Sequence, residues 1–162
     1  MATIMRAGRP HRAAGFTYVV MLAALAIFGV GLAALGQTWS EASRREREQE
    51  LLQVGAAYAT AIAAYHRLSP GGTPRYPLSL DELVDDRRFV GTVRHLRRLY
   101  LDPVTRSPLE PVRDRAGLIV GVRSVSTVRA LRRMPYQLPS GGHIDGERYM
   151  DWQFVYVPSG LP

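Results

Sequence analysis

Residues 16–36 read FTYVVMLAALAIFGVGLAALG, an apolar run of 21 residues without a single charge. At about 1.5 Å of rise per residue, a helix of this length covers the roughly 30 Å hydrocarbon core of a bilayer. Arg6, Arg9 and Arg12 precede the run, and Glu41 is the first charged residue after it. Because basic residues stay on the cytoplasmic side, we expect a transmembrane helix whose N-terminus lies in the cytoplasm.

The composition of the whole chain is that of one globular domain. Its 162 residues are 46% apolar and 22% charged, and none is cysteine, which excludes collagen, low-complexity disorder and a disulfide framework. All 21 basic residues are arginine, against 14 acidic residues. Without the three arginines of the first fifteen residues, 18 basic against 14 acidic side chains leave +4. Such a modest excess gives little support for a nucleic-acid partner.

The apolar run has two interpretations, a cleaved secretory signal and a retained membrane helix. A signal peptide has an apolar core of about 7 to 15 residues and a small-x-small cleavage site. Ala34-Leu35-Gly36 before Gln37 could supply that site. The run is longer than such a core, so its length favours a retained helix.

The start of the run, HRAAGFTYVVML over residues 11–22, adds a second signal. A short basic leader ends in Gly15 and is followed at once by Phe16 and an apolar helix. This arrangement resembles the class III leader of type IV pilins and type II secretion pseudopilins. In those proteins prepilin peptidase cuts after the glycine and methylates the new amino terminus. The resemblance therefore implies a leader of residues 1–15 that is removed between Gly15 and Phe16.

One position departs from this family pattern. Pilin-like proteins usually carry a glutamate at the fifth mature residue, and Val20 occupies that place here. A carboxylate in a bilayer is costly and is kept only for a purpose. Its absence favours a minor subunit over a repeating major subunit.

Residues 37–68 are expected to extend the same helix beyond the membrane. Glu41 and Arg45, and Arg44 and Glu48, stand four residues apart and can pair along one face. After them, apolar residues recur at intervals of three and four, which is typical of an amphipathic helix laid against a domain: Leu51, Val54, Tyr58, Ala61, Ile62, Tyr65 and Leu68. Ser69-Pro70-Gly71-Gly72 ends the pattern. One helix over residues 16–68 would be about 80 Å long, as in a pilin subunit.

The next segment, RYPLSLDELVDD over residues 75–86, contains a helix-start signal. Ser79 can cap the first turn while Glu82 reaches back to the N–H of Ser79, and Leu78 can pack on Leu83. We expect a short helix over residues 80–86. The phrase Tyr-Pro-x-Ser-Leu-x-x-Leu resembles the linker after the long helix in major pseudopilins. The nearby acids are expected to form a solvated face: Asp81, Glu82, Asp85 and Asp86.

Residues 87–106 are dense in arginine, with six in twenty positions: Arg87, Arg88, Arg94, Arg97, Arg98 and Arg106. Phe89 and Tyr100 lie among them, so phosphate binding with base stacking is conceivable. The acids before this segment offer ready partners, which favours a solvated basic face instead. His95 has no second ligand at metal spacing.

The remainder, residues 69–162, is expected to form a periplasmic α+β head. Strings 109–113 and 118–124 flank Asp114-Arg115-Ala116-Gly117 and predict a hairpin, while residues 152–157 alternate as a third strand. The fold class is therefore α+β, a long helix packed on an antiparallel sheet of about three strands. Asp102-Pro103-Val104-Thr105 resembles the turn that opens the sheet region of pseudopilins, with Arg106 replacing a glycine.

Residues 125–150 form a long connection rich in proline and glycine. The corresponding region of major pseudopilins binds calcium, and Asp145, Glu147 and Asp151 are the candidate ligands here. Calcium takes six to eight oxygens, and these three side chains match no ligand motif. We therefore assign no metal and no cofactor, and Asp145-Gly146 can simply be a turn.

No catalytic constellation emerges from the sequence, since it has neither a nucleophile elbow nor a phosphate-binding glycine loop. The chain is expected to be a non-enzymatic pseudopilin of the bacterial inner membrane, with its head in the periplasm. Its expected partners are other pseudopilins, the inner-membrane assembly platform and prepilin peptidase. The alternative is a single-pass, membrane-anchored periplasmic binding or sensor module.

Overall fold

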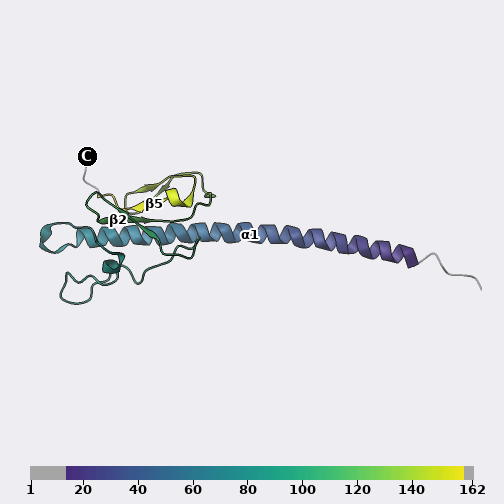
Figure 1. Ribbon diagram of the computed structural model, residues 1–162, viewed down its shortest axis with the longest axis horizontal. Helices are drawn as coiled ribbons and strands as arrows, with labels where there is room; N and C mark the ends of the chain where they lie inside the picture. Colours follow the sequence, from purple (N-terminus) through teal and green to yellow (C-terminus); the bar gives the residue numbers. More distant parts are fainter. Residues whose placement is uncertain (1–13, 159–162) are drawn as a thin grey trace, which may run out of the picture. The chain divides into compact units, whose positions relative to one another are not determined.

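The computed structural model describes residues 14–158, apart from the side chains of residues 14, 15 and 33–39. Its largest element is α1 (Ala14–Arg67), drawn from purple to teal in Figure 1. The single helix expected over residues 16–68 is thus confirmed as one helical element. The expected leader lies almost wholly outside the described residues. The chain divides into two compact units, Met1–Ser43 and Arg44–Pro162.

In the first unit, every described side chain from Phe16 to Leu32 is exposed. Phe16, Ile27 and Phe28 each expose more than 70% of their surface. Within the part of the chain that the structure describes, no helix has both the length and the hydropathy needed to cross a membrane. This differs from the span expected over residues 16–36, whose last four side chains belong to the undescribed stretch.

The second unit contains the expected three-stranded antiparallel sheet. Its strands are β1 (Glu110–Arg113), β2 (Ile119–Arg123) and β5 (Gln153–Val155), in the order β1-β2-β5. The β1–β2 hairpin is closed by Asp114, whose carboxylate accepts the N–H groups of Ala116 and Leu118. Both the hairpin and the third strand are confirmed, and the α+β class with them.

Several shorter elements complete the unit. Two-residue strands β3 (Tyr136–Gln137) and β4 (His143–Ile144) pair antiparallel inside the long connection of residues 125–150, where no strand was expected. Two 3-10 helices follow α1, η1 (Pro70–Gly72) and η2 (Leu80–Leu83). A third, η3 (Tyr149–Asp151), leads into β5. Strands of two residues carry too little periodicity to be recognised in a sequence.

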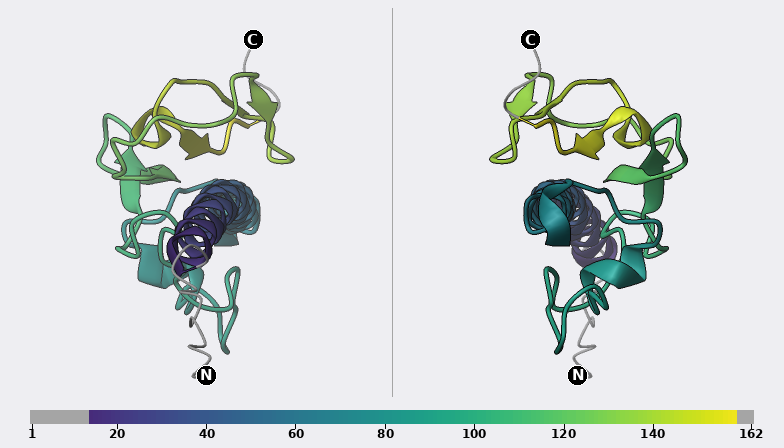
Figure 2. Two further views of the ribbon diagram at one scale, coloured as in Figure 1. Left: turned by 90° about the vertical axis from the view of Figure 1, so that its right-hand side faces the viewer. Right: turned by 90° about the vertical axis from the view of Figure 1, so that its left-hand side faces the viewer.

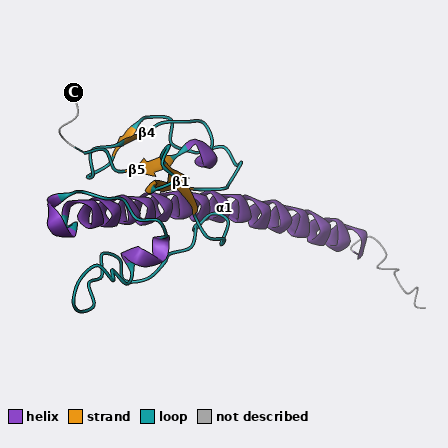
Figure 3. Cartoon of the chain, turned by 60° about the vertical axis from the view of Figure 1, so that its left-hand side comes forward, coloured by secondary structure: helices purple, strands orange, loops and turns teal. Residues whose placement is uncertain are grey.

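The part of α1 in the second unit lies between two layers. The sheet covers one side, and the segment with η2 covers the other (Figures 2 and 3). Gly55 allows the close approach to the sheet, because a Cβ there would lie 2.1 Å from the ring of Phe154 in β5. The expected stripe is largely buried: Leu51, Tyr58, Ala61, Ile62 and Tyr65 are in the core, and Val54 packs against it. Leu68 is an exception, since it follows the helix and is 56% exposed.

The helix start after α1 differs from the expectation in three details. The helix ends at Leu83 rather than at residue 86, and it is a 3-10 helix. Ser79 does cap it, but through the N–H of Asp81, and the Glu82 carboxylate instead accepts from the Tyr65 hydroxyl. Leu78 is 62% exposed and forms no staple on the buried Leu83. The Glu82 carboxylate therefore bonds the Tyr65 hydroxyl on α1 instead of the N–H of Ser79.

At the turn that begins at Asp102, an arginine occupies the position expected for a glycine. Arg106 adopts φ of 62°, a left-handed conformation that favours glycine. Its N–H donates to the carbonyl of Asp102 at 2.8 Å. The fully buried Asp102 carboxylate accepts from the N–H of Val104 at 2.7 Å and from the hydroxyl of Ser124 at 2.5 Å. These bonds hold the arginine in a backbone region that costs about 1–2 kcal/mol.

Candidate functional site

The first candidate site is the apolar surface of α1 in the first unit. Eleven large apolar side chains between residues 16 and 32 are exposed: Phe16, Tyr18, Val19, Val20, Met21, Leu22, Leu25, Ile27, Phe28, Val30 and Leu32. They point in all directions around the helix, since no described residue in this stretch is buried. Gly29 and Gly31 are also open, because a Cβ added at either would meet no atom within 4 Å. A surface of this kind requires an apolar environment from outside the chain.

Gly15 and Phe16, the residues expected to flank the cleavage site, fall at the start of this surface. Phe16 is 73% exposed, and Gly15 lies in the first turn of α1, where only the backbone is described. Val20 is 50% exposed, within the same apolar surface. Val20, which stands where pilin-like proteins usually have a glutamate, thus lies among uncharged side chains.

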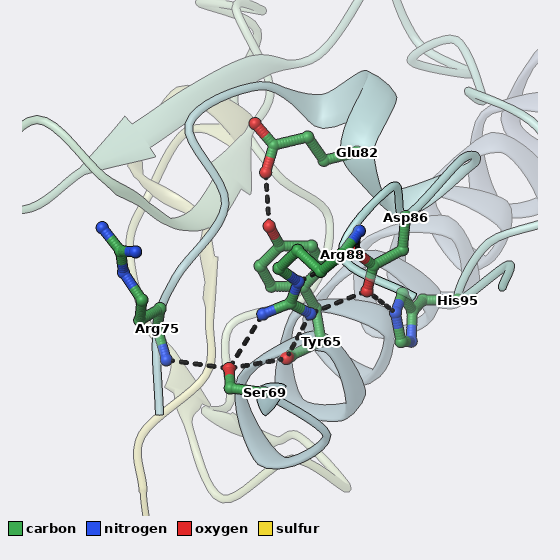
Figure 4. Close-up of polar contacts among 7 residues, drawn as sticks. All are labelled: Tyr65, Ser69, Arg75, Glu82, Asp86, Arg88 and His95. Atoms are coloured by element: carbon green, nitrogen blue, oxygen red, sulfur yellow. Dashed lines mark hydrogen bonds and ion pairs between the residues drawn. The ribbon is translucent and has the colours of Figure 1, made fainter. Parts of the chain in front are cut away.

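The second candidate site is a polar cluster at the C-terminal end of α1 (Figure 4). We call it the helix-end cluster, and it consists of Tyr65, Ser69, Glu82, Asp86, Arg88 and His95. Asp86 is 1% exposed and is its centre. The Asp86 Oδ2 accepts from Arg88 Nη2 at 2.7 Å and lies 2.9 Å from His95 Nε2. The Oδ1 accepts from the N–H and Nε of Arg88 at 3.1 and 2.9 Å.

Arg88 joins this carboxylate to the end of α1. Its Nη2 donates to the carbonyl of Tyr65 at 3.0 Å and its Nη1 to the hydroxyl of Ser69 at 2.8 Å. The guanidinium also lies 3.4 Å from the centre of the Tyr65 ring. A cation at the C-terminus of a helix is favoured by the helix dipole and satisfies carbonyls that lack intrahelical partners. Arg88 therefore caps α1 from a loop that follows it in the chain.

The protonation states fit this capping role. Burial raises the pKa of Asp86, but hydrogen bonds from Arg88 and His95 outweigh it and lower the pKa to about 2. Burial and the bonded Glu82 carboxylate raise the pKa of the Tyr65 hydroxyl well above its usual range. Asp86 is thus ionised and accepts hydrogen bonds, while Tyr65 stays protonated and donates a hydrogen bond to Glu82. Both groups hold segments together rather than exchange protons near neutral pH.

A third group of contacts is centred on Glu48, a buried acid in α1. Its carboxylate accepts from the N–H of Leu131 at 2.7 Å, from the N–H of Arg132 at 3.1 Å and from the hydroxyl of Tyr149 at 2.9 Å. The expected pairing of Arg44 with Glu48 is not among the ion pairs of the described residues, and neither is that of Glu41 with Arg45. Arg44 instead donates to the carbonyl of Arg129. Long-range backbone groups have therefore taken the place of the Arg44–Glu48 pair.

The acids expected to be solvated are divided by the fold. Asp81 and Asp85 are exposed and Glu82 is half-buried, but Asp86 is buried in the helix-end cluster. The arginines after them find the expected acidic partners in two cases, Arg87 with Asp85 and Arg88 with Asp86. Among the other arginines of this segment, the Arg98 guanidinium lies 5.3 Å from the centre of the Tyr100 ring.

The three calcium candidates do not converge. Asp145 accepts from the N–H of Gly146, Asp151 accepts from the N–H of Arg148, and Glu147 pairs with Arg129. Among the residues that the structure describes, no three histidine or acidic side chains are grouped as a metal site would require.

Sequence reasoning missed the roles of Glu48 and His95. Glu48 had a signal, because it lies three residues before Leu51 and thus in register with the buried stripe. A charge at such a position indicates a buried partner. For His95 no local signal exists, since its partner Asp86 belongs to a loop whose course is set by tertiary packing.

Comparison with known proteins gives no relative: the chain matches no protein-family model, no curated protein and no solved structure.

Proposed function

We propose that this chain is a pseudopilin, a subunit of a type II secretion or type IV pilus-like filament that acts in protein export across the outer membrane. The observation that carries the proposal is the division of α1. Residues 16–32 expose apolar side chains all around the helix, while the stripe from Leu51 to Tyr65 is buried in an α+β unit. A filament subunit needs both, an apolar helix for neighbouring subunits and a folded head at the other end.

The exposed apolar side chains support a location in two successive environments. Burial of apolar surface contributes about 25 cal/mol per Å², so this stretch is strongly disfavoured in water. Before assembly, the bacterial inner membrane would surround it, with the N-terminus in the cytoplasm and the head in the periplasm. After assembly, the helices of other pseudopilins would surround it in the filament core. Prepilin peptidase and the inner-membrane assembly platform are the proposed partners that act on the chain as it passes from the membrane into the filament.

Val20 supports a minor role in such a filament. A free amino terminus at Phe16 has to be desolvated among apolar helices, and an unpaired buried ammonium costs several kcal/mol. Other subunits can supply the missing carboxylate, whereas copies of this chain cannot. The chain should therefore join filaments built mainly by another pseudopilin. Overproduced alone it should not polymerise, and Val20→Glu should increase self-assembly.

The experiment that tests the filament role is site-specific photo-crosslinking in cells of the source bacterium. A photoreactive residue at Leu25, which is 58% exposed, should capture the N-terminal helix of another pilin-like protein. The same residue at Val90, at an exposed loop of the head, is the matched control and should not capture that helix. Adducts only with lipid at Leu25, in cells that are secreting, would contradict a filament subunit and favour the membrane-anchored binding or sensor module.

A further inference from the structure

The segment 128–134, which reads VRALRRM, combines exposed apolar and basic side chains in one loop between β2 and β3. Val128 is 48% exposed, Leu131 39% and Met134 78%. Three arginines alternate with them, Arg129, Arg132 and Arg133, and all three are exposed. We call this segment the arginine loop. Large apolar side chains at an exposed loop cost free energy in water and are typical of a contact surface.

The arginine loop is fixed to the beginning of the second unit. The Glu48 carboxylate, which is 7% exposed, accepts the N–H groups of Leu131 and Arg132. Arg44 donates to the carbonyl of Arg129. The N–H of Ala130 donates to the carbonyl of Glu147 at 2.8 Å. These backbone contacts position the loop. Of its side chains, Arg129 pairs with Glu147 and the Arg132 guanidinium lies 5.3 Å from the centre of the Tyr136 ring, while Leu131 and Met134 are exposed.

The surface around the loop is positively charged. Four guanidinium groups line one hollow with two carboxylates: Arg44, Arg129, Arg132 and Arg133 against Asp145 and Glu147. Glu147 is already paired with Arg129 at 2.9 Å, and Asp145 accepts from the N–H of Gly146. Arg132 and Arg133 have no acidic partner among the described ion pairs. Guanidinium groups without an acidic partner can bind two phosphate oxygens at once through parallel N–H groups.

Arg44 lies a short distance along the chain from the apolar run. It follows Gly36, the last residue of that run, by eight residues, about 12 Å along a helix. No charged residue lies between Arg12 and Glu41. If the uncharged run lies in a bilayer, Arg44 and the loop bonded to it follow the membrane-embedded residues closely along the chain, within reach of the lipid headgroups on the periplasmic side.

We propose that the arginine loop docks on anionic phospholipid headgroups of the membrane that holds the chain. The arginines bind lipid phosphates, while Leu131 and Met134 enter the interface between headgroups and acyl chains. The proposal rests on the membrane location given under Proposed function. Docking would hold the head of an unassembled subunit in one orientation on the membrane until it is extracted into a filament.

The test uses the full chain in nanodiscs, either of neutral phosphatidylcholine or with about three parts in ten of anionic phosphatidylglycerol. Because the chain has no cysteine, single cysteines can carry an environment-sensitive fluorophore. Met134→Cys reports on the loop and Val90→Cys is the control on the head. Val30→Cys reports on insertion of the apolar run. Spin-labelled headgroup lipids quench fluorophores that reach the interface.

The Met134→Cys label should be blue-shifted and quenched in anionic discs, much less in neutral discs, and the Val90→Cys label in neither. The double variant Arg132→Gln, Arg133→Gln should lower the ratio of docked to free loop by about 25-fold, because each arginine near an anionic surface contributes about fivefold to this ratio. A buried Val30→Cys label with an unquenched Met134→Cys label would overturn the docking proposal alone. Equal quenching in both lipids would overturn the role of the arginines. A water-exposed Val30→Cys label would contradict the proposed membrane location instead.

Discussion

The two stretches of α1 contain similar apolar residues in different surroundings. From Phe16 to Leu32 every described side chain is exposed, whereas Leu51, Tyr58 and Ile62 are at most 1% exposed in the second unit. The stretch in the second unit packs between the sheet and the segment with η2, and from Leu51 to Tyr65 it exposes only Gln53 and Thr60. The stretch in the first unit is apolar all around, so a single face of a small head could not cover it. The head thus covers one stretch of the helix, while the described side chains of the other stay exposed.

A buried charge gives the largest expected difference between the stretches. Tyr58 is 1% exposed, and its hydroxyl donates to the carbonyl of Tyr100 and accepts the N–H of the same residue. Tyr58→Asp removes this packing and buries a carboxylate, so it should lower the free energy of unfolding of the head by about 4 kcal/mol. Fluorescence of Trp152, which is 2% exposed, reports unfolding of the detergent-solubilised chain in a Trp39→Phe background. Val19→Asp, in the exposed stretch, is the control and should leave this transition unchanged.

A pair of glycine substitutions gives the next difference. Gly55→Ala should destabilise the head by about 2 kcal/mol, because the new methyl group meets the Phe154 ring in a filled core. Gly29→Ala should stabilise the helix by up to about 1 kcal/mol, because nothing lies near it and alanine is the better helix former. Urea unfolding in the same detergent measures both signs, followed by Trp152 fluorescence for Gly55→Ala and by the circular dichroism of the helix for Gly29→Ala. A stabilising Gly55→Ala would show that the sheet does not approach α1 so closely.

The helix-end cluster should make the stability of the head depend on pH. Since the pKa of Asp86 is lowered from 3.8 to about 2, its contribution of about 2 kcal/mol is complete above pH 4 and is lost as the pH falls towards 2. Asp86→Asn should therefore cost about 2 kcal/mol at pH 7, with the difference from the wild type vanishing near pH 2. Urea unfolding of both proteins from pH 7 to pH 2 measures this. Asp81→Asn, at an exposed position, should show little difference at any pH.

The smallest effect is expected at Arg106. Arg106→Gly removes the cost of a left-handed conformation in a side-chain-bearing residue. It also makes the unfolded chain more flexible, so the net gain should be below about 1 kcal/mol. A rise of a few degrees in the thermal midpoint would agree. A loss of stability would mean that the arginine side chain contributes packing of its own.

The sequence predicted those features that depend on local pattern. The helix, the β1–β2 hairpin with its Asp114-to-Gly117 turn and the strand β5 each carry a periodicity or a turn residue that acts over a few positions. Features that join distant segments were missed. The Glu48 carboxylate bonds backbone groups more than 80 residues away, and Glu82 bonds Tyr65 in place of its own helix start. In both cases a tertiary partner took the place of a local one, which for the Arg44–Glu48 pair would contribute only a few tenths of a kcal/mol.

Of the candidate functional residues, too, those that depend on local composition were predicted and those whose surroundings are set by tertiary packing were not. The apolar surface around Val20 was visible in the sequence, because it needs only composition and length. The Asp86 environment was not, since a solvated acid and a buried one look alike until the loop from Arg87 to His95 is placed. The prediction that nearby acids pair with the arginines is confirmed for Arg87 and Arg88, because their partners Asp85 and Asp86 lie only two residues away.

We propose that cleavage by prepilin peptidase makes Phe16, at the start of the exposed stretch of α1, the mature terminus of a pseudopilin. Intact-mass measurement of the chain extracted from membranes tests it most directly, in cells with and without prepilin peptidase. We predict loss of residues 1–15 and a methylated Phe16, both dependent on the peptidase and both blocked by Gly15→Asp. Retention of Met1, or a mature terminus at Gln37, would contradict the claim.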